Sequence, residues 1–153
     1  ILNVASMAGL GGVPYSGAYT ASKAAVVALS ESWAPELKKH SIGVSVLCPA
    51  FVKTRIYDSE RNRPDKFKSD TYGIENEQSF LNQMKQLVKE GIDVSIVGKR
   101  VVEAISNGEL YIFTHPNYRK LNQERFAAID EAFARSEKSA LLKDILNQKP
   151  EGL

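Results

Sequence analysis

The sequence is poor in the side chains that cross-link chains or bind metal ions. Cys48 is the single cysteine among 153 residues, so an internal disulfide is excluded. The two histidines, His40 and His115, are too far apart in sequence for a local zinc motif, and we expect no metal site. Cys48 ends an apolar run, which favours a buried and inert thiol, and a lone cysteine agrees with a reducing, cytoplasmic compartment.

Long apolar runs and a strong excess of one charge are also missing. No stretch approaches the roughly 18 residues of a membrane-spanning helix, so the sequence predicts no membrane span. A net charge of +2 is too small to indicate nucleic acid or an anionic membrane as a partner. With 43% hydrophobic and 25% charged residues, the composition is that of an ordinary soluble globular protein.

A glycine-rich phosphate-binding turn of the G-x-G-x-x-G type is missing as well. Gly9, Gly11 and Gly12 precede Pro14 instead of joining a strand to a helix. The sequence does not begin with Met, and its first residues, 1–5, already have the apolar character of a buried strand. We therefore expect the chain to be the C-terminal half of a longer protein.

What the first part of the sequence does contain is a strand, a long helix and a second strand. Residues 1–5 and 42–48 are apolar runs typical of buried parallel strands. Between them, residues 17–40 repeat alanine and larger apolar side chains at helical spacing, with Ser16 as the expected N-cap. This order predicts a parallel sheet with a right-handed crossover, which binds ligands at the carboxyl ends of its strands.

The later part predicts further helices and one more strand. Residues 53–83 have the length and mixed composition of a long connection, and a helical repeat of apolar residues begins at Phe80. Ser95 is expected to cap the next helix, and Gly108 to end it. The remaining predicted elements are a strand at residues 110–114 and helices at about residues 118–135 and 138–146.

Tyr19 and Lys23 have the clearest chemical meaning. Four residues apart in a helix, their side chains share one face, with Cβ atoms roughly 5–6 Å apart. An ammonium beside a phenol favours the phenolate, which helps a phenol to exchange a proton with an alcohol or ketone near neutral pH. Ser6 would complete such a site by hydrogen-bonding the substrate oxygen. The pair alone does not exclude an ordinary surface helix, because this spacing also arises by chance.

The spacing of Ser6 and Tyr19, the Gly-Gly-Val-Pro loop between them and the run from Cys48 to Thr54 together resemble the short-chain dehydrogenase/reductase family, specifically its compact subclass. In that family a strand ends in the catalytic Ser, and the next helix carries Tyr-x-x-x-Lys. The following strand ends in Pro-Gly-x-x-x-Thr. The combination is far more specific than any one of its parts.

The resemblance implies an NAD(P)-dependent oxidoreductase that interconverts a secondary alcohol and a ketone. It implies that Tyr19 is the general acid/base, that Lys23 binds the nicotinamide ribose and that Ser6 orients the substrate oxygen. The cofactor-binding set that it implies is Tyr19, Lys23, Pro49, Val52 and Thr54. The activity is expected of the full-length parent protein and not of these 153 residues alone.

The same resemblance implies a fold and partners. The fold is α/β: the C-terminal portion of a Rossmann-like, doubly wound parallel sheet with extra C-terminal helices. Residues 1–116 would form the C-terminal half of the catalytic domain, with a substrate loop at about 53–83, and residues 117–153 a helical extension. The partners would be a small-molecule alcohol or ketone and further copies in a homodimer or homotetramer. Ala50 stands where the family has Gly, and a positive φ there would strain an alanine.

Two other functions stay open at this point. An epimerase or dehydratase of the extended branch also uses Tyr-x-x-x-Lys and a nicotinamide, although the short spacing from Lys23 to the next strand argues against it. A catalytically silent, cofactor-binding oligomeric module is the other, although intact Ser6, Tyr19 and Lys23 argue against lost catalysis. NAD and NADP both stay open as the cofactor, because in this family the residues that discriminate between them follow the second strand, which we expect upstream of Ile1.

Overall fold

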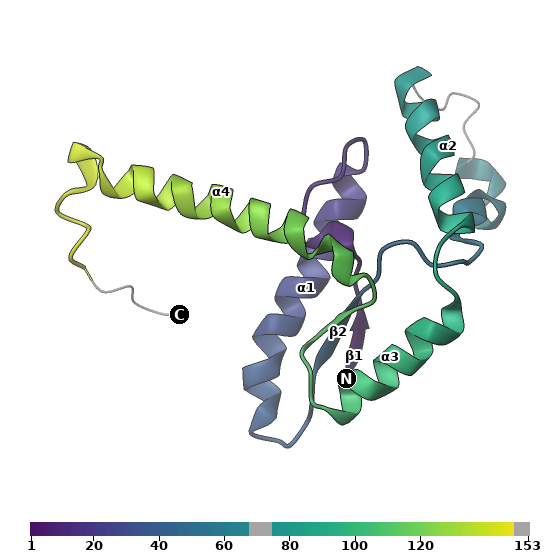
Figure 1. Ribbon diagram of the computed structural model, residues 1–153, viewed down its shortest axis with the longest axis horizontal. Helices are drawn as coiled ribbons and strands as arrows, with labels where there is room; N and C mark the ends of the chain where they lie inside the picture. Colours follow the sequence, from purple (N-terminus) through teal and green to yellow (C-terminus); the bar gives the residue numbers. More distant parts are fainter. Residues whose placement is uncertain (68–74, 149–153) are drawn as a thin grey trace. The chain divides into compact units, whose positions relative to one another are not determined.

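A parallel sheet of three strands forms the centre of the first of two units. The computed structural model describes residues 1–67 and 75–148, and the chain divides into two units, Ile1–His115 and Pro116–Leu153. The first unit contains the sheet (Figure 1), with Asn3 paired to Val46 and Leu47 paired to Ile112. In spatial order the strands are β1 (Leu2–Val4), β2 (Ser45–Cys48) and β3 (Tyr111–Phe113).

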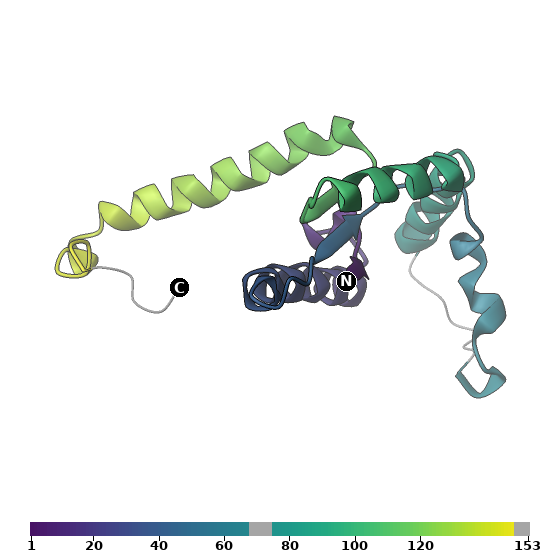
Figure 2. The same cartoon turned by 90° about the horizontal axis from the view of Figure 1, so that it is seen from below.

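Two helices, α1 (Gly17–Lys38) and α3 (Val94–Ser106), cover opposite faces of the sheet, as Figure 2 shows. The reason is the alternation of side chains along β2. Val46 and Cys48 pack with Val27 of α1, whereas Leu47 packs with Ala104 of α3. The predicted α/β fold with a doubly wound parallel sheet is therefore confirmed.

The strands are shorter than the apolar runs that predicted them. Residues 42–44 lie outside β2, because pairing with β1 begins only where Leu2 meets Ser45. Val44 is nevertheless buried. An apolar run in this sequence therefore predicts which residues are buried better than it predicts which residues pair in the sheet. The strand ends that carry the site are unaffected by this difference.

The helix ends follow the sequence only in part. Ser16 precedes α1, as expected, but its side chain makes no capping hydrogen bond. At α3 the prediction was wrong: Asp93, not Ser95, is the cap, and its carboxylate accepts a 2.8 Å hydrogen bond from Ser95 N–H. Asp93 and Ser95 are both residue types that can cap a helix, and Asp93 is the one whose backbone is extended just before the first helical residue. Gly108 follows the end of α3 with φ of 68°, the left-handed conformation that was expected of it.

The connection between β2 and α3 is more ordered than a loop. It contains two 3-10 helices, η2 (Ile56–Asn62) and η3 (Asp65–Phe67), and the helix α2 (Glu75–Lys89). The predicted loop at 53–83 therefore ended too late, because the first turn of α2 is polar and its apolar repeat begins only at Phe80. Residues 68–74 of that predicted loop lie outside the described residues.

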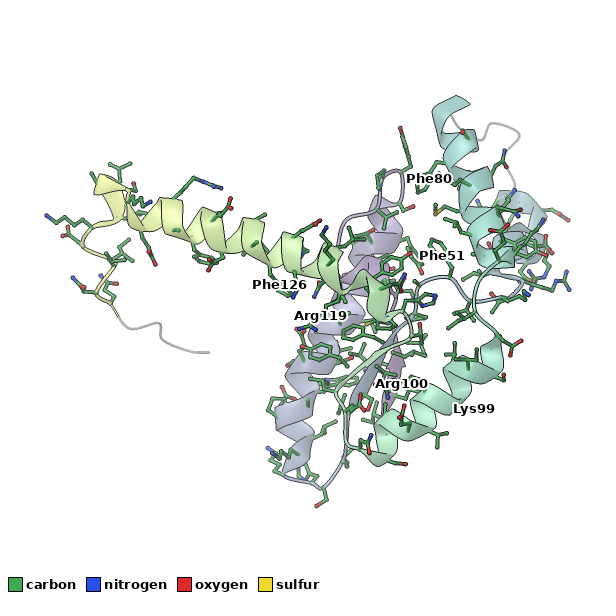
Figure 3. All side chains as sticks on the ribbon, in the orientation of Figure 1. Phe51, Phe80, Lys99, Arg100, Arg119 and Phe126 are labelled. Carbon is green, nitrogen blue, oxygen red and sulfur yellow. The ribbon has the colours of Figure 1, made fainter. Side chains whose placement is uncertain are left out.

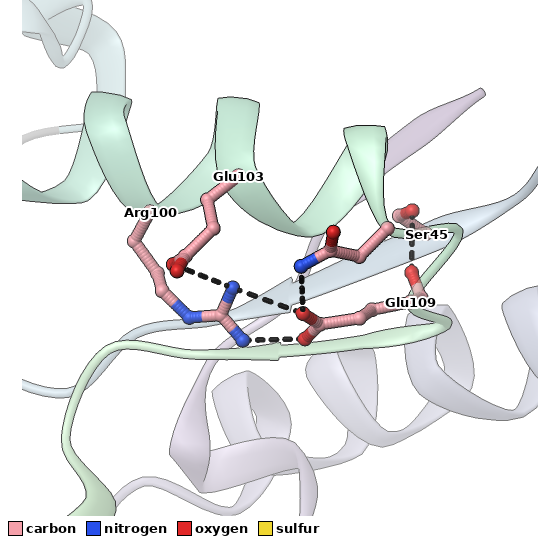
Figure 4. A network of polar contacts seen from close by, with 5 residues as sticks. Ser45, Arg100, Glu103 and Glu109 are labelled. Carbon is pink, nitrogen blue, oxygen red and sulfur yellow. Dashed lines mark hydrogen bonds and ion pairs between the residues drawn. The ribbon is translucent and has the colours of Figure 1, made fainter.

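A polar network connects the amino ends of β2 and β3 with α3 (Figure 4). Arg100 of α3 makes a two-pronged ion pair with Glu109, which precedes β3, and this bond keeps the pKa of the Glu109 carboxyl below its usual value. The backbone carbonyl of Glu109 accepts a 2.7 Å hydrogen bond from Ser45 Oγ, at the start of β2. The network lies at the opposite end of the strands from the candidate site.

The second unit consists of one long helix between short 3-10 turns. Its elements are η4 (Pro116–Tyr118), α4 (Arg119–Glu137) and η5 (Ala140–Leu142). The predicted extra helix at 118–135 is thus present as α4, but the second, at 138–146, is reduced to η5. Leu141 there is 92% exposed. A segment that buries so little apolar surface lacks the packing that stabilises short helices.

Candidate active site

Ser6 lies directly after β1 and begins the short 3-10 helix η1 (Met7–Gly9). Its Oγ accepts a 3.2 Å hydrogen bond from Ala8 N–H, and its hydroxyl donates to the carbonyl of Pro49 over 3.4 Å. The same carbonyl accepts a 2.9 Å bond from Met7 N–H. These bonds join the carboxyl end of β1 to that of β2, as the parallel topology predicts.

Tyr19 and Lys23 lie in the first turns of α1. Lys23 Nζ is 5.8 Å from the centre of the Tyr19 ring, so the expected shared face is present. The ammonium also donates a 3.1 Å hydrogen bond to the backbone carbonyl of Val4, the last residue of β1. The Tyr19 side chain remains accessible, at 43% exposure. Lys23 therefore connects the helix that carries the phenol to the strand end that precedes Ser6.

Gly9 allows η1 to lie directly against α1. A Cβ atom at this position would stand 2.7 Å from the carbonyl oxygen of Lys23 and 3.1 Å from a methyl group of Val27. A glycine is therefore required for this approach. The sequence predicted a glycine-rich loop here but did not indicate which of its glycines lies against α1.

The segment after β2 carries Pro49, Val52 and Thr54. Val52 forms an isolated parallel bridge with Ile92. Two backbone hydrogen bonds make this bridge: Ile92 N–H donates to Phe51 O (3.1 Å), and Lys53 N–H donates to Ile92 O (2.8 Å). Thr54 Oγ1 accepts a 3.4 Å bond from the amide that follows two residues later. Val52 is thus held against the residue two positions before α3, and Thr54 bonds within its own turn.

Two details of this segment were not visible in the sequence. Gly91 permits its close approach, because a Cβ there would stand 2.5 Å from Phe51 O. Ala50, which stands where the family that the sequence resembles has glycine, is unstrained: the described non-glycine residues with positive φ are Tyr15 and Ser41. Its N–H instead donates to His115 Nδ1 over 3.4 Å. In the sequence His115 was considered only as one of two histidines too far apart for a zinc motif.

An aromatic contact borders the site on the side of α2. Phe80 of α2, labelled in Figure 3, has its ring centre 5.6 Å from that of Tyr15, in the loop before α1. Tyr15 adopts a φ of 56°, which is uncommon for a residue with a side chain. The helical repeat that begins at Phe80 thus brings the connection between β2 and α3 against the loop that leads to Tyr19.

Cys48, one residue before Pro49, takes no part in this chemistry. It is fully buried, and burial raises the pKa of its thiol to about 11, so the thiolate is strongly disfavoured at neutral pH. Within the described ranges, no cluster of three or more His, Cys, Asp or Glu side chains could hold a metal ion. In the same part of the chain, no helix is long and apolar enough to cross a membrane.

Comparison with known proteins gives consistent matches. A family model described as short chain dehydrogenase matches residues 1–65. A "CLA biosynthesis dehydrogenase/reductase" of Lactiplantibacillus plantarum is 34% identical over 134 residues, which is 84% of this chain and 47% of that relative. A "C alpha-dehydrogenase" of a Sphingobium strain is 32% identical over 134 residues, or 88% of this chain and 43% of that relative.

A solved structure matches the whole chain. A short chain dehydrogenase/reductase from Burkholderia phymatum, in complex with NAD, superimposes with a TM-score of 0.79 at 32% identity. The match covers 100% of this chain and 51% of that one. The chain thus spans about half the length of the relatives it matches.

Proposed function

The chain belongs to the short-chain dehydrogenase/reductase family, and we propose that the whole protein is an NAD(P)-dependent oxidoreductase that interconverts a secondary alcohol and a ketone. One observation carries this proposal. Lys23 lies 5.8 Å from the Tyr19 ring and bonds to Val4, two residues before Ser6. An accessible phenol, an ammonium and a hydroxyl are thereby tied to one strand end.

In this proposal Tyr19 moves the proton. During alcohol oxidation its phenolate oxygen takes the hydroxyl proton of the substrate, and during ketone reduction the phenol returns it. Lys23, held by Val4, presents its positive charge to the Tyr19 ring from a fixed position. A bound nicotinamide would accept or supply the hydride. An alcohol and a ketone differ by this proton and this hydride, so the step is balanced.

Ser6 is proposed to hold the substrate oxygen. Its Oγ already accepts from Ala8 N–H, so its own proton is the group left to donate. The present acceptor, Pro49 O, is 3.4 Å away, which is long for a hydroxyl donor. The proton can therefore turn to a substrate oxygen at little cost.

The residues present fit the nicotinamide side of the cofactor. Lys23 supplies a cation for the ribose hydroxyls, and Thr54, whose Oγ1 accepts from Ile56 N–H, keeps its proton to donate to a carboxamide. Pro49 and Val52 are proposed to border the ring. NAD is found with the similar Burkholderia phymatum protein. For this protein NAD and NADP are both proposed.

We further propose that the whole protein is a cytoplasmic homodimer or homotetramer that acts on a small-molecule substrate, with α1 or the C-terminal helix in the interface. Contiguous apolar surface on a helix is usually covered by its own domain or by a partner. Large apolar side chains that α4 leaves exposed are Leu121, Phe126, Ile129 and Phe133. Light scattering of the whole protein tests this, and a monomer mass would reject it.

The function is tested by following NAD(P)H absorbance while the whole protein acts on a panel of secondary alcohols and ketones. The Tyr19→Phe variant should lose at least about a hundredfold in rate, the usual size of general acid–base catalysis, and should still bind cofactor. Tyr15→Phe is the matched control, because Tyr15 lies four residues earlier and is also exposed. Absence of turnover with every substrate and either cofactor, or an active Tyr19→Phe variant, would reject the proposal.

A further inference from the structure

The peptide group that joins Pro49 to Ala50 is held on both sides. Its carbonyl oxygen accepts from Met7 N–H (2.9 Å) and from the Ser6 hydroxyl (3.4 Å). Its N–H donates to His115 Nδ1 (3.4 Å). Because the carbonyl and N–H of a peptide are coplanar, contacts at both ends fix the rotation of the whole group. One peptide thus connects the carboxyl ends of all three strands.

The histidine in this arrangement is itself held. His115 is half-buried directly beyond β3, and Thr114 Oγ1 lies 2.7 Å from its Nδ1. To accept a hydrogen bond from Ala50, Nδ1 must carry no proton, so the neutral ring has its proton on Nε2. The Thr114 hydroxyl is then a second donor to the same nitrogen and helps to fix the orientation of the ring.

We propose that His115 is a positioning residue of the active site, which holds the Pro49–Ala50 peptide and, through the bond from Met7 N–H to its carbonyl, the backbone next to Ser6. The proposal rests on the proposed function, since it assigns a role within the same site. Bonds in a line through one peptide polarise and orient one another. Without an acceptor at Nδ1, the Ala50 N–H loses its partner and the peptide is free to turn.

The effect extends in two directions along the chain. On one side the peptide carbonyl accepts the 2.9 Å bond from Met7 N–H and so holds the backbone next to Ser6, the residue proposed to bind the substrate oxygen. On the other side it begins the segment proposed to border the nicotinamide, whose far end is fixed by the bridge between Val52 and Ile92. His115 therefore holds the near end of a segment whose far end is held by Ile92, and in this proposal it acts through the peptide.

Two polar substitutions of His115 in the whole protein distinguish its role as a hydrogen-bond acceptor at Nδ1 from a role in packing alone. In His115→Asn the side-chain oxygen lies near the former Nδ1, whereas in His115→Gln it lies nearer the former Nε2. Loss of one hydrogen bond predicts that His115→Gln lowers kcat/KM by about three- to tenfold, while His115→Asn keeps most of the activity. The control is His40, exposed beyond the end of α1, changed to the same two residues; neither change should alter kcat/KM.

Hydrogen exchange of the Ala50 amide gives a readout that does not need turnover. It should be slow in wild type and His115→Asn and faster in His115→Gln, with melting temperature as the check on folding. Equal exchange and equal kinetics in all three proteins, or an equal loss in both variants, would overturn the proposal. If wild type shows no turnover, the proposed function fails, and the exchange experiment still decides whether His115 holds Ala50.

Discussion

The ammonium of Lys23, on α1, donates a 3.1 Å hydrogen bond to the carbonyl of Val4, the last residue of β1. A helix residue thus takes up the carbonyl of the last residue of the strand. The Lys23 ammonium keeps two further protons that it can donate. Its nitrogen lies 5.8 Å from the centre of the Tyr19 ring. One side chain thus joins the sheet, the helix and the proposed acid/base.

Replacing this ammonium should impair the proposed chemistry more than the fold. We expect Lys23→Met to lower kcat/KM by about 10- to 100-fold, the range for losing a charged hydrogen bond, and to raise KM for NAD(P). Methionine keeps the apolar stem, so the melting temperature should change little. Lys38→Met, on the exposed last turn of α1, is the control. Steady-state kinetics equal to wild type would remove Lys23 from the site.

A methyl group at Gly9 should force η1 away from α1. The added Cβ would meet Lys23 O at 2.7 Å, which backbone atoms cannot tolerate without moving. We expect Gly9→Ala to lower the free energy of unfolding by about 1–3 kcal/mol, as overpacking usually does, and to reduce activity because Ser6 moves with η1. Gly11→Ala in the same loop is the control, since its Cβ would meet no atom within 4 Å. Urea denaturation that gives the same stability for both variants would contradict this prediction.

Tyr111 should make stability fall at high pH. Its hydroxyl donates a 2.7 Å hydrogen bond to Glu31 Oε1, and this bond, together with burial, raises the pKa of Tyr111 to about 12. Tyrosine in an unfolded chain titrates near pH 10, so between about pH 10 and 12 the native state keeps a proton that the unfolded state has lost. The free energy of unfolding therefore decreases as pH rises through this window.

The measurement is urea denaturation at several pH values from 9 to about 11.5. Tyr111→Phe should be less stable than wild type at pH 9 and should lose less stability as the pH rises. Tyr15→Phe, at an exposed tyrosine outside this contact, should follow wild type. If the free energy of unfolding fell equally with pH in wild type and Tyr111→Phe, the bond to Glu31 would not control the pH dependence of stability.

The thiol of Cys48 should be inert while the protein is folded. Burial raises its pKa to about 11, so at pH 8 the thiolate is about a hundredfold scarcer than for an ordinary cysteine. We expect slow alkylation by iodoacetamide in the native protein and rapid alkylation in urea, followed by mass spectrometry. The Cys48→Ala variant gives the background, and rapid labelling of the native protein would contradict the prediction.

The local features of this protein could be predicted from the sequence alone. The four-residue spacing of Tyr19 and Lys23 places both on one helix face, and Gly108 ends a helix because glycine readily adopts positive φ. Apolar runs around a helical repeat gave a parallel α/β sheet with Ser6 and Pro49 at neighbouring strand ends. The first two follow from residues within a few positions of one another, and the sheet follows from the order of such segments along the chain.

Other features depended on tertiary structure. Asp93 caps α3 in place of Ser95, and the predicted helix at 138–146 shrinks to η5, because packing and backbone geometry decide between local alternatives. The contacts that build the site join residues far apart in sequence: Lys23 with Val4, Gly9 with Lys23, and Ala50 with His115. Side-chain type and periodicity specify which segments form and which face they bury. Which atom then meets which across the sheet is set only when the segments pack together.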